Sequence, residues 1–400
     1  MAHPIRHDGR RMSDLVLYDA VIIGGGLVGS STALELSRRG LKTLVLEQFA
    51  PAGERGSSHG DGRMIRYDYG EAIYVEMVRQ AFEAWDDLAA RSGTRLLAPT
   101  GSCNFGTDDS PQLAAIEENF RCVGIRFERL SASRLNKKIP QFHLENGSAA
   151  VFQADAGVLF AGTAVNTLWN QAILAGATCV RGERVDEIEH DGTYIHAHSA
   201  SGQTWIGQTL VIAAGGWAGH WADRLKLQIP LTTTQEVLAY FPPKDGFDHS
   251  VGVMPNCIDY HTAHPFYSLP QVDVPGVKAG WHHTGQIIDP DDPRPIDESN
   301  LEAIKDFIRR RCPHLIPEPF KTTKCLYTNS PDYHFVIDKH PDFDCIIIAT
   351  GFSGHGFKFG PVIAKMLAAM VLDETPPVPL DLFSVNRFQK IDKLVPRIIA

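Results

Sequence analysis

Three glycines and one carboxylate near the start of the chain have the types and spacing of a nucleotide-binding turn. Gly24, Gly26 and Gly29 follow the pattern Gly-x-Gly-x-x-Gly, and Glu47 comes 18 residues after the last of them. In such a turn the glycines permit a tight bend, close approach of a pyrophosphate and close helix–strand packing. The acid binds a ribose hydroxyl, and its presence in place of an arginine disfavours a 2′-phosphate. The spacing therefore predicts FAD or NAD as the ligand, and not NADP.

The elements around these residues fit that chemistry. An apolar run over 18–23 leads into the glycines, a helical segment runs from Leu27 to Gly40, and a second apolar run over 41–46 ends at Glu47. This strand–helix–strand unit is typical of a buried parallel sheet. Two later apolar runs, before Gly215 and Gly351, also end in glycines. A long cofactor that crosses the whole sheet would explain them, so FAD is favoured over NAD.

Four further motifs place cations, histidines and a cysteine among glycines and aromatic residues. They are Arg-Gly-Ser-Ser-His-Gly-Asp-Gly-Arg-Met-Ile-Arg over 55–66, Gly-Val-Lys-Ala-Gly-Trp-His over 276–282, Lys-Cys-Leu-Tyr-Thr over 324–328, and Gly-Phe-Ser-Gly-His-Gly-Phe-Lys-Phe over 351–359. In this order and spacing the motifs resemble the monomeric sarcosine oxidase family of amine-oxidising flavoenzymes, from about Tyr18 to Phe388. Members of that family oxidise sarcosine, N-methyltryptophan, pipecolate or fructosyl amino acids with FAD.

The resemblance implies which residues hold the flavin. Cys325 is expected to attach it covalently through a thioether. Val185 matches a position whose backbone meets the adenine. The other flavin-contacting positions match glycines, small polar residues, a histidine and charged residues of the family's motifs: Gly24, Gly26, Gly29, Glu47, Ser57, Ser58, His59, Arg63, Gly354, Gly356 and Lys358. Of these, His59 and Arg63 are expected beside the flavin ring, among the catalytic residues.

The resemblance also implies how the substrate is bound. Arg66 and Lys358 are expected to hold the substrate carboxylate, since arginine offers a bidentate fork and lysine a point charge. Tyr267 and Tyr327 match tyrosines that line the family's substrate pocket.

Lys278 and His282 complete the predicted catalytic set. Lys278 matches a lysine that lies over the flavin and assists oxygen reduction, where a fixed cation stabilises developing negative charge. His282 matches an active-site histidine, and His283 is a second candidate by adjacency. Because successive residues of a strand point to opposite faces, only one of the two histidines is expected to face the flavin.

Together these residues predict an FAD-dependent oxidase of a small secondary-amine amino acid, such as a sarcosine-like N-methyl amino acid. Hydride equivalents would pass from the carbon beside the nitrogen to the flavin, the imine would hydrolyse, and O2 would be reduced to H2O2. Three alternatives stay open. The substrate could be a cyclic imino acid such as pipecolate or proline, or a larger N-alkyl amino acid; the enzyme could be an FAD dehydrogenase with another electron acceptor; or the chain could be a flavin-binding subunit without turnover.

Three places depart from the family pattern on the substrate side. Gly62 stands where sarcosine oxidases usually have threonine, which is expected to open space near Arg63. Trp281 replaces a smaller aromatic residue before His282, and 251–265 match the family's gating segment poorly. These departures leave the substrate side chain open.

The pattern of elements predicts an α/β fold with two domains. A discontinuous Rossmann-type FAD-binding domain is expected over 13–95, 155–230 and 322–395. A β-sheet substrate-binding domain with flanking helices is expected over 96–154 and 231–321. Periodicity predicts helices near 71–91, 111–123, 300–311 and 361–372, the third opened by a capping box from Ser299 to Glu302. Residues 1–12 fit none of the motifs and are expected to be disordered.

Composition and charge argue against several other classes. The 400 residues include 38 Lys and Arg against 47 Asp and Glu, and the net charge of −9 argues against a nucleic-acid partner. No apolar run reaches the roughly 18 residues of a membrane span. Seven cysteines without pairing motifs favour a reducing cytoplasm over a disulfide framework. The spacing of His196 and His198 suits a metal pair, but an exposed strand is expected there, so no metal is predicted. The protein is expected to be a monomer.

Overall fold

A mainly parallel sheet carries the glycine turn. The computed structural model describes residues 16–393. An eight-stranded sheet has the order β10, β11, β12, β1, β2, β9; β20 pairs with the second half of β12, and β19 pairs with β20. Its strands are β1 (Leu17–Ile23), β2 (Thr43–Glu47), β9 (Thr178–Arg181), β10 (Val185–His190), β11 (Ile195–Ser199), β12 (Thr204–Ile212), β19 (Val336–Lys339) and β20 (Ile346–Thr350). The five strands β9, β2, β1, β12 and β20 run parallel, as in dinucleotide-binding folds.

Alternate residues of β1 enter two different cores. Ala20 and Ile22 pack against helices on one face of the sheet, whereas Val21 and Ile23 pack toward the β10–β11 hairpin and α6 (Ala218–Arg224) on the other. The helices of the first face are α1 (Leu27–Arg38), α2 (Ala72–Ser92), α5 (Ala161–Leu174) and α8 (Gly360–Val371). A strand buried on both faces must be apolar throughout, which explains the unbroken apolar run over 20–23.

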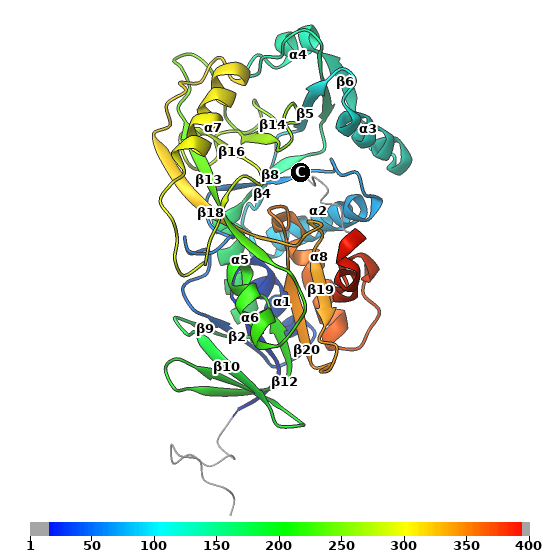
Figure 1. The fold of residues 1–400 in the computed structure, drawn as a ribbon, viewed down its shortest axis with the longest axis vertical. Coiled ribbons are helices and arrows are strands. Elements are labelled where there is room, and N and C mark those ends of the chain that lie inside the picture. The colour runs from blue at the N-terminus through cyan, green and yellow to red at the C-terminus, as the bar shows by residue number, and fades with distance from the viewer. Residues whose placement is uncertain (1–15, 394–400) are drawn as a thin grey trace, which may run out of the picture.

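A second, mostly antiparallel sheet lies at the other end of the molecule (Figure 1). Its order is β17, β13, β16, β15, β14, β5, β7, β6, and β18 pairs with the free edge of β13. Its strands are β5 (Ser102–Thr107), β6 (Glu128–Ser131), β7 (Ser148–Gln153), β13 (Thr232–Phe241), β14 (Asn256–Asp259), β15 (Phe266–Leu269), β16 (Val277–Trp281), β17 (Gln286–Ile287) and β18 (Lys321–Asn329). The helices α4 (Ala132–Lys138) and α7 (Glu298–Arg311) pack on its outer face, so its inner face is left to the site.

Smaller elements join the two sheets. A three-stranded sheet is formed by β3 (Gly62–Ile65), β8 (Gly157–Phe160) and β4 (Leu97–Pro99). Short 3-10 helices follow the glycine turns and end the described chain: η2 (Gly215–Trp217), η3 (Phe357–Phe359), η4 (Asp381–Phe383) and η5 (Val385–Lys393). The predicted domain boundary at 322 falls inside β18, which is paired along its length with β13. The division into domains stays a prediction, and residues 1–12 lie outside the described part of the chain.

The predicted helices are found, with one wrong start. Helix α3 (Pro111–Val123) and helices α2, α7 and α8 lie where periodicity placed them. Helix α7 begins at Glu298, however, and its N-cap is Asp297, whose Oδ1 accepts hydrogen bonds from the backbone N–H groups of Ser299 and Asn300 at 3.0 and 3.2 Å. The Ser299 capping box is therefore wrong, because Asp297 caps the helix two residues earlier, at the N–H groups of Ser299 and Asn300. Within 16–393 no helix is both long and apolar enough to cross a membrane.

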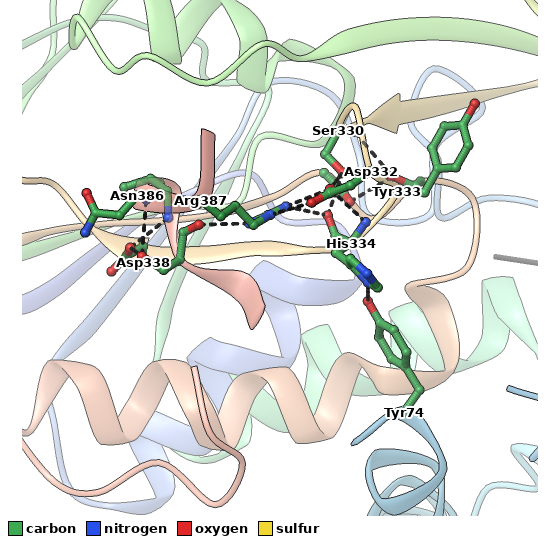
Figure 2. A network of polar contacts seen from close by, with 12 residues as sticks. Tyr74, Ser330, Asp332, Tyr333, His334, Asp338, Asn386 and Arg387 are labelled. Atoms are coloured by element: carbon green, nitrogen blue, oxygen red, sulfur yellow. Dashed lines mark hydrogen bonds and ion pairs between the residues drawn. The ribbon is translucent and has the colours of Figure 1, made fainter. Parts of the chain in front are cut away.

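The C-terminal segment is fixed to the loop between β18 and β19 by a buried polar network (Figure 2). Arg387 donates from Nε and Nη2 to the carboxylate of Asp332 at 2.8 and 3.2 Å, and from Nη2 to the carbonyl oxygen of His334 at 3.0 Å. Ser330 Oγ donates to the same carbonyl oxygen at 2.6 Å, and the ring of His334 meets the hydroxyl of Tyr74 at 3.0 Å. The network therefore joins α2, the β18–β19 loop and η5.

Candidate flavin and substrate site

A long cavity of about 300 Å³ lies at the carboxyl ends of the parallel strands. Ligands bind at this edge in open α/β sheets. Ten of the predicted flavin-contacting residues line it: Gly24, Gly26, Glu47, Ser57, Ser58, Arg63, Val185, Cys325, Gly354 and Gly356. Gly29, His59 and Lys358 are not part of this lining.

The glycine turn fits the role predicted from its spacing. Gly24 has a φ of +97°, and a Cβ at this position would lie 2.4 Å from the carbonyl oxygen of Ala213. A Cβ at Gly29 would lie 1.8 Å from the carbonyl oxygen of Gly24, so Gly29 shapes the turn from behind and does not face the cavity. Helix α1 begins directly after the turn and presents its N-terminus to the cavity, as phosphate binding requires.

Glu47 is held at the edge of this cavity by the backbone. Its two carboxylate oxygens accept hydrogen bonds from the N–H groups of Gly25 and Phe49 at 2.7 and 2.8 Å. Burial raises the pKa of the Glu47 carboxyl, and these two hydrogen bonds oppose that rise. The side chain is fixed with acceptor capacity to spare, which suits a ribose hydroxyl. The glycine cradle, the helix N-terminus and this acid together fit FAD.

A smaller cavity of about 90 Å³ adjoins the long one. The two share five lining residues, namely Arg63, Cys325, Tyr327, Gly354 and Phe357. The predicted substrate and oxygen residues all line the smaller cavity: Arg66, Tyr267, Lys278, His282, Tyr327 and Lys358. The structure thus brings together residues from four motifs that lie far apart in the sequence.

Two basic side chains meet at one wall of the smaller cavity. Lys358 Nζ donates to the hydroxyl of Tyr69 at 2.8 Å and to the carbonyl oxygen of His355 at 2.9 Å. Arg66 donates to the carbonyl oxygen of Asp68 at 2.6 Å, and its guanidinium lies 5.1 Å from the centre of the Tyr69 ring. Burial, and then the charge of Arg66, lowers the pKa of Lys358 well below its usual range. An anion bound here would restore the charged form of the lysine.

Lys278 faces the same cavity from β16. It is 3% exposed, and its Nζ donates to the carbonyl oxygen of Gly62 at 2.9 Å. Burial and the charge of Arg63 lower the pKa of Lys278 to about 7, whereas the carboxylate of Asp61 opposes the fall. A buried lysine of this kind is placed to exchange a proton near neutral pH.

Cys325 lies where the two cavities meet. Its Sγ is 3.9 Å from Arg63 Nη2 and 3.8 Å from the carbonyl oxygen of Ser57. His59 lies behind this wall and lines neither cavity; its Nε2 is 2.8 Å from the carbonyl oxygen of Lys324. Burial, followed by the charges of Arg63 and Lys278, lowers the pKa of His59 to about 4. A neutral His59 therefore supports β18 and has no direct access to either cavity.

The two adjacent histidines do not follow strand alternation. Strand β16 ends at Trp281, and His283 has a φ of +57°, so both rings turn toward Tyr327, at 5.3 and 5.6 Å between ring centres. His282 Nδ1 lies 3.1 Å from the Tyr327 hydroxyl and lines the cavity, whereas His283 stacks on Tyr333. Only one of the two histidines lines a cavity, as expected, but strand alternation is not the reason, because the strand has already ended.

The sequence departures have different outcomes. Gly62 opens no space, because a Cβ there would lie 3.0 Å from Val158 and 3.2 Å from Leu269. This expectation is wrong, since aliphatic side chains fill the room that a larger residue would need. Trp281 stacks on Phe266 in the outer core and is not part of the cavity lining. From the poorly matching segment 251–265, only Ile258 and Pro265 line the smaller cavity.

Three residues of the site are missing from the predicted set. Asp61 lies inside the 55–66 motif, and Asp68 and Tyr69 follow it directly. This stretch is rich in glycine and arginine, shows no periodicity and contains two aspartates. That pattern was a signal that the aspartates pair with basic side chains of the site. Asp68 does lie 3.8 Å from Arg66, but Asp61 and Tyr69 pair with Lys278 and Lys358, which come from distant segments, so no spacing rule could pair them.

His196 and His198 have ordinary partners. His196 Nε2 lies 2.7 Å from Asp191 Oδ2, and His198 Nδ1 lies 3.0 Å from Thr204 Oγ1. The strand is less exposed than expected, because His196 is buried. Among the described residues no group of three or more His, Cys, Asp or Glu side chains is arranged to hold a metal ion.

Comparison with known proteins identifies the family. The model of the FAD dependent oxidoreductase family matches residues 19–370. The chain belongs to this family. As a family member it is similar to the peroxisomal sarcosine oxidase of Mus musculus, with 33% identity over 94% of this chain and 97% of that protein. It is 30% identical to the monomeric sarcosine oxidase of Bacillus sp. (strain B-0618), over 92% of this chain and 96% of that protein.

A third relative of this flavoenzyme is the N-methyl-L-tryptophan oxidase of Salmonella typhimurium, with 32% identity over 93% of this chain and 100% of that protein. The sarcosine oxidase resemblance is thus confirmed, and the chain is an FAD-dependent oxidoreductase. Its fold is shared with NikD, an unusual amino acid oxidase, at 22% identity, a TM-score of 0.82, and coverage of 92% of this chain and 97% of that one. L-proline dehydrogenase from P. horikoshii has 21% identity, a TM-score of 0.82, and coverage of 94% and 99%. The predicted α/β, Rossmann-type fold class is confirmed.

Proposed function

We propose that this flavoenzyme oxidises a small amino acid with a secondary amine, of the sarcosine kind, with O2 as acceptor and H2O2 as product. The observation that carries the proposal is the pair Arg66 and Lys358 in a 90 Å³ cavity that meets the long cavity at Cys325. Charge-assisted hydrogen bonds from both side chains would hold a carboxylate against one wall. The rest of the substrate would then fill the space next to the shared wall.

The same positive surroundings act on the substrate amine. Burial and neighbouring cations both disfavour an ammonium group, so the amine would bind neutral, with its lone pair free. Tyr267, Tyr327 and His282 line the cavity and would exclude water while orienting the amine. A pH titration of the charge-transfer absorption of the complex is expected to give a pKa for the bound amine below its solution value. An unchanged value would contradict this step.

Bound FAD would accept two electrons from the carbon beside the substrate nitrogen and pass them to O2. Lys278, which lines the same cavity, would hold a positive charge and a proton where oxygen is reduced. The oxidised substrate would leave as an imine and hydrolyse in water.

A substrate panel tests the proposal. Apart from its basic residues, the smaller cavity is lined mainly by apolar side chains, among them Met64, Leu238, Ile258 and Leu269. Peroxide release is therefore expected with sarcosine, N-methylalanine or a cyclic imino acid, and not with N-methylaspartate, whose second carboxylate would face aliphatic groups. Reduction of an artificial dye without peroxide would identify a dehydrogenase. No turnover of any member of the panel would overturn the proposal.

We also propose that the flavin is attached covalently through Cys325. The proposal is supported by the place of Sγ, which lies at the junction of the two cavities and beside Arg63. Acid precipitation of the holoenzyme is expected to leave the yellow colour in the pellet, and to release it to the supernatant in Cys325→Ser. Free flavin from the unsubstituted protein would contradict covalent attachment.

The family resemblance further supports a monomer as the working form. Sedimentation of the holoenzyme is expected to give a single species near 44.1 kDa. A species of twice that mass would contradict it.

A further inference from the structure

Two buried polar residues lie behind Lys278, away from both cavities. Strands β13 and β16 pair so that Tyr240 lies directly opposite Lys278, and side chains in such a pair share a face of the sheet. The Tyr240 hydroxyl donates to Asp61 Oδ1 at 2.8 Å, and the same oxygen lies 3.9 Å from Lys278 Nζ. All three side chains are less than a tenth exposed. A buried carboxylate therefore faces a buried amine.

The carboxylate cannot turn away from the lysine without losing two hydrogen bonds. Asp61 Oδ1 accepts from the backbone N–H of Gly62 at 2.8 Å as well as from Tyr240. The Gly62 carbonyl oxygen in turn accepts from Lys278 Nζ. Lys278 lines the smaller cavity, whereas Asp61 and Tyr240 line neither, so they act on the lysine from behind.

We propose that Asp61, held by Tyr240, is a positioning residue that keeps Lys278 charged and aimed into the cavity. The inference rests on the proposed oxidase function, which gives Lys278 its place in oxygen reduction. The ionisable groups around the lysine come from several elements: Asp61 and His59 from the loop before β3, Arg63 from β3, Tyr240 from β13 and Cys325 from β18.

Asp61 opposes the main influences on the lysine. Burial and Arg63 lower the pKa of Lys278, and Asp61 raises it. Burial and Asp61 raise the pKa of Tyr240, so the phenol stays a hydrogen-bond donor. Replacing Asp61 by asparagine would keep the size and remove the charge. The pKa of Lys278 would then fall further. At a pH above this pKa, a pKa lower by one pH unit means a charged fraction of Lys278 about tenfold smaller.

The first test measures oxygen reduction without any amine substrate. The holoenzyme is reduced with dithionite and mixed with O2 at a series of pH values. In Asp61→Asn we expect reoxidation at pH 8 to be about tenfold slower, with the fall in rate beginning about one unit lower in pH. Tyr240→Phe is the milder variant and should shift the profile less, in the same direction. In Lys278→Met the reoxidation rate should no longer depend on the titration of this lysine.

Lys321→Met is the matched control. Lys321 is exposed on β18, and its Nζ lies 5.4 Å from the Tyr240 ring, so the variant removes a cation near the same tyrosine without touching the pair. Its reoxidation profile should not change. Unchanged profiles in Asp61→Asn and Tyr240→Phe would overturn the inference.

The second test reads the lysine itself. In protein labelled at lysine Cε, the NMR signal of Lys278 is assigned by its absence in Lys278→Met. Its titration midpoint should fall in Asp61→Asn and stay the same in Lys321→Met. If Asp61→Asn reoxidised more slowly at every pH while the titration midpoint of Lys278 stayed the same, Asp61 would be merely structural. That result would overturn the inference. If Lys278→Met reoxidised as fast as the unsubstituted enzyme, the oxygen role of Lys278 would fail, while the midpoint would still decide the role of Asp61.

Discussion

At the scale of single residues, the buried charges of the site form two similar groups. Each has two basic side chains and one aspartate: Arg66, Lys358 and Asp68 form the substrate group, and Arg63, Lys278 and Asp61 form the group around Lys278. Buried charges are tolerated when they are paired, and each group has one basic residue more than it has acids. Each group can therefore balance one negative charge that arrives with a ligand.

The substrate group predicts a pH-dependent affinity. Because burial and Arg66 lower the pKa of Lys358, a bound carboxylate must bring a proton onto this lysine. Affinity is then fully present below the pKa of Lys358 in the free enzyme and declines as the pH rises through it. Titration of propionate binding should show this decline, and Lys358→Met should bind about 10- to 100-fold more weakly at low pH with a flat profile. The partly exposed Lys365→Met is the control, and equal slopes in all three proteins would contradict the prediction.

Glu236 predicts a pH effect on stability. Burial raises its pKa to about 7 from 4.5, and hydrogen bonds from Thr234, Thr284 and Gly285 oppose the rise. The folded state therefore holds this proton more tightly than the unfolded chain, so the free energy of unfolding falls as the pH rises from about 4.5 to 7. Glu236→Gln should lose less stability between pH 5 and pH 8, by on the order of 2–3 kcal/mol.

Thermal unfolding of the holoenzyme at both pH values measures this difference. The exposed Glu187→Gln should follow the unsubstituted protein. If Glu236→Gln lost as much stability as the unsubstituted enzyme, Glu236 would not hold the extra proton.

At the scale of elements, the glycines at the two ends of α1 allow backbone strain to be distinguished from steric conflict. Gly24 and Gly40 both have positive φ, at +97° and +86°, but only at Gly24 would a Cβ meet backbone, whereas Gly40 has open space. Alanine costs about 1–2 kcal/mol of backbone strain at either site. Gly40→Ala should keep its flavin, and Gly24→Ala should be purified with little or none. Flavin absorbance per protein measures this, and equal content in the two variants would contradict the steric role of Gly24.

The network in Figure 2 makes a second prediction at this scale. The Arg387–Asp332 pair is nearly buried, with side chains 12% and 9% exposed, so Arg387→Ala leaves a buried carboxylate without its charged partner. Breaking such a pair costs about 3–5 kcal/mol, measured by denaturant unfolding. The exposed Arg91–Asp87 pair is the control, because Arg91→Ala should cost less than about 1 kcal/mol. Similar losses in the two variants would show that the network does not fix the C-terminal segment.

The elements also show why some features could be predicted from the sequence and others could not. The β1–α1–β2 unit and the cations of the motifs were predictable, because their spacing along the chain carries the chemistry. The roles of Tyr240 and Asp61 were not, because Tyr240 reaches Lys278 through the register between β13 and β16, and Asp61 reaches it from the distant loop before β3. The room at Gly62 was misjudged for the same reason, since Val158 and Leu269 reach it from other strands.

At the scale of the whole molecule, the site is built where the two large sheets approach each other. The motifs at 55–66, 276–282, 324–328 and 351–359 meet there, although up to about 300 residues of chain separate them. The order of the motifs along the chain says nothing about the distances between them, so the two cavities and their common wall appear only in the folded chain. The C-terminal network holds the loop after β18 in place from outside this region.

Strand β18 has a consequence for how this enzyme can change its specificity. Cys325 and Tyr327 are two residues apart on one face of the strand, and both line both cavities. A substitution that shifts β18 would therefore disturb the cofactor and the substrate wall together. Ile258 on β14 and Leu269 on β15 line only the smaller cavity. Evolution toward new amines, in nature or in the laboratory, is free to change Ile258 and Leu269 and is constrained to leave β18 alone.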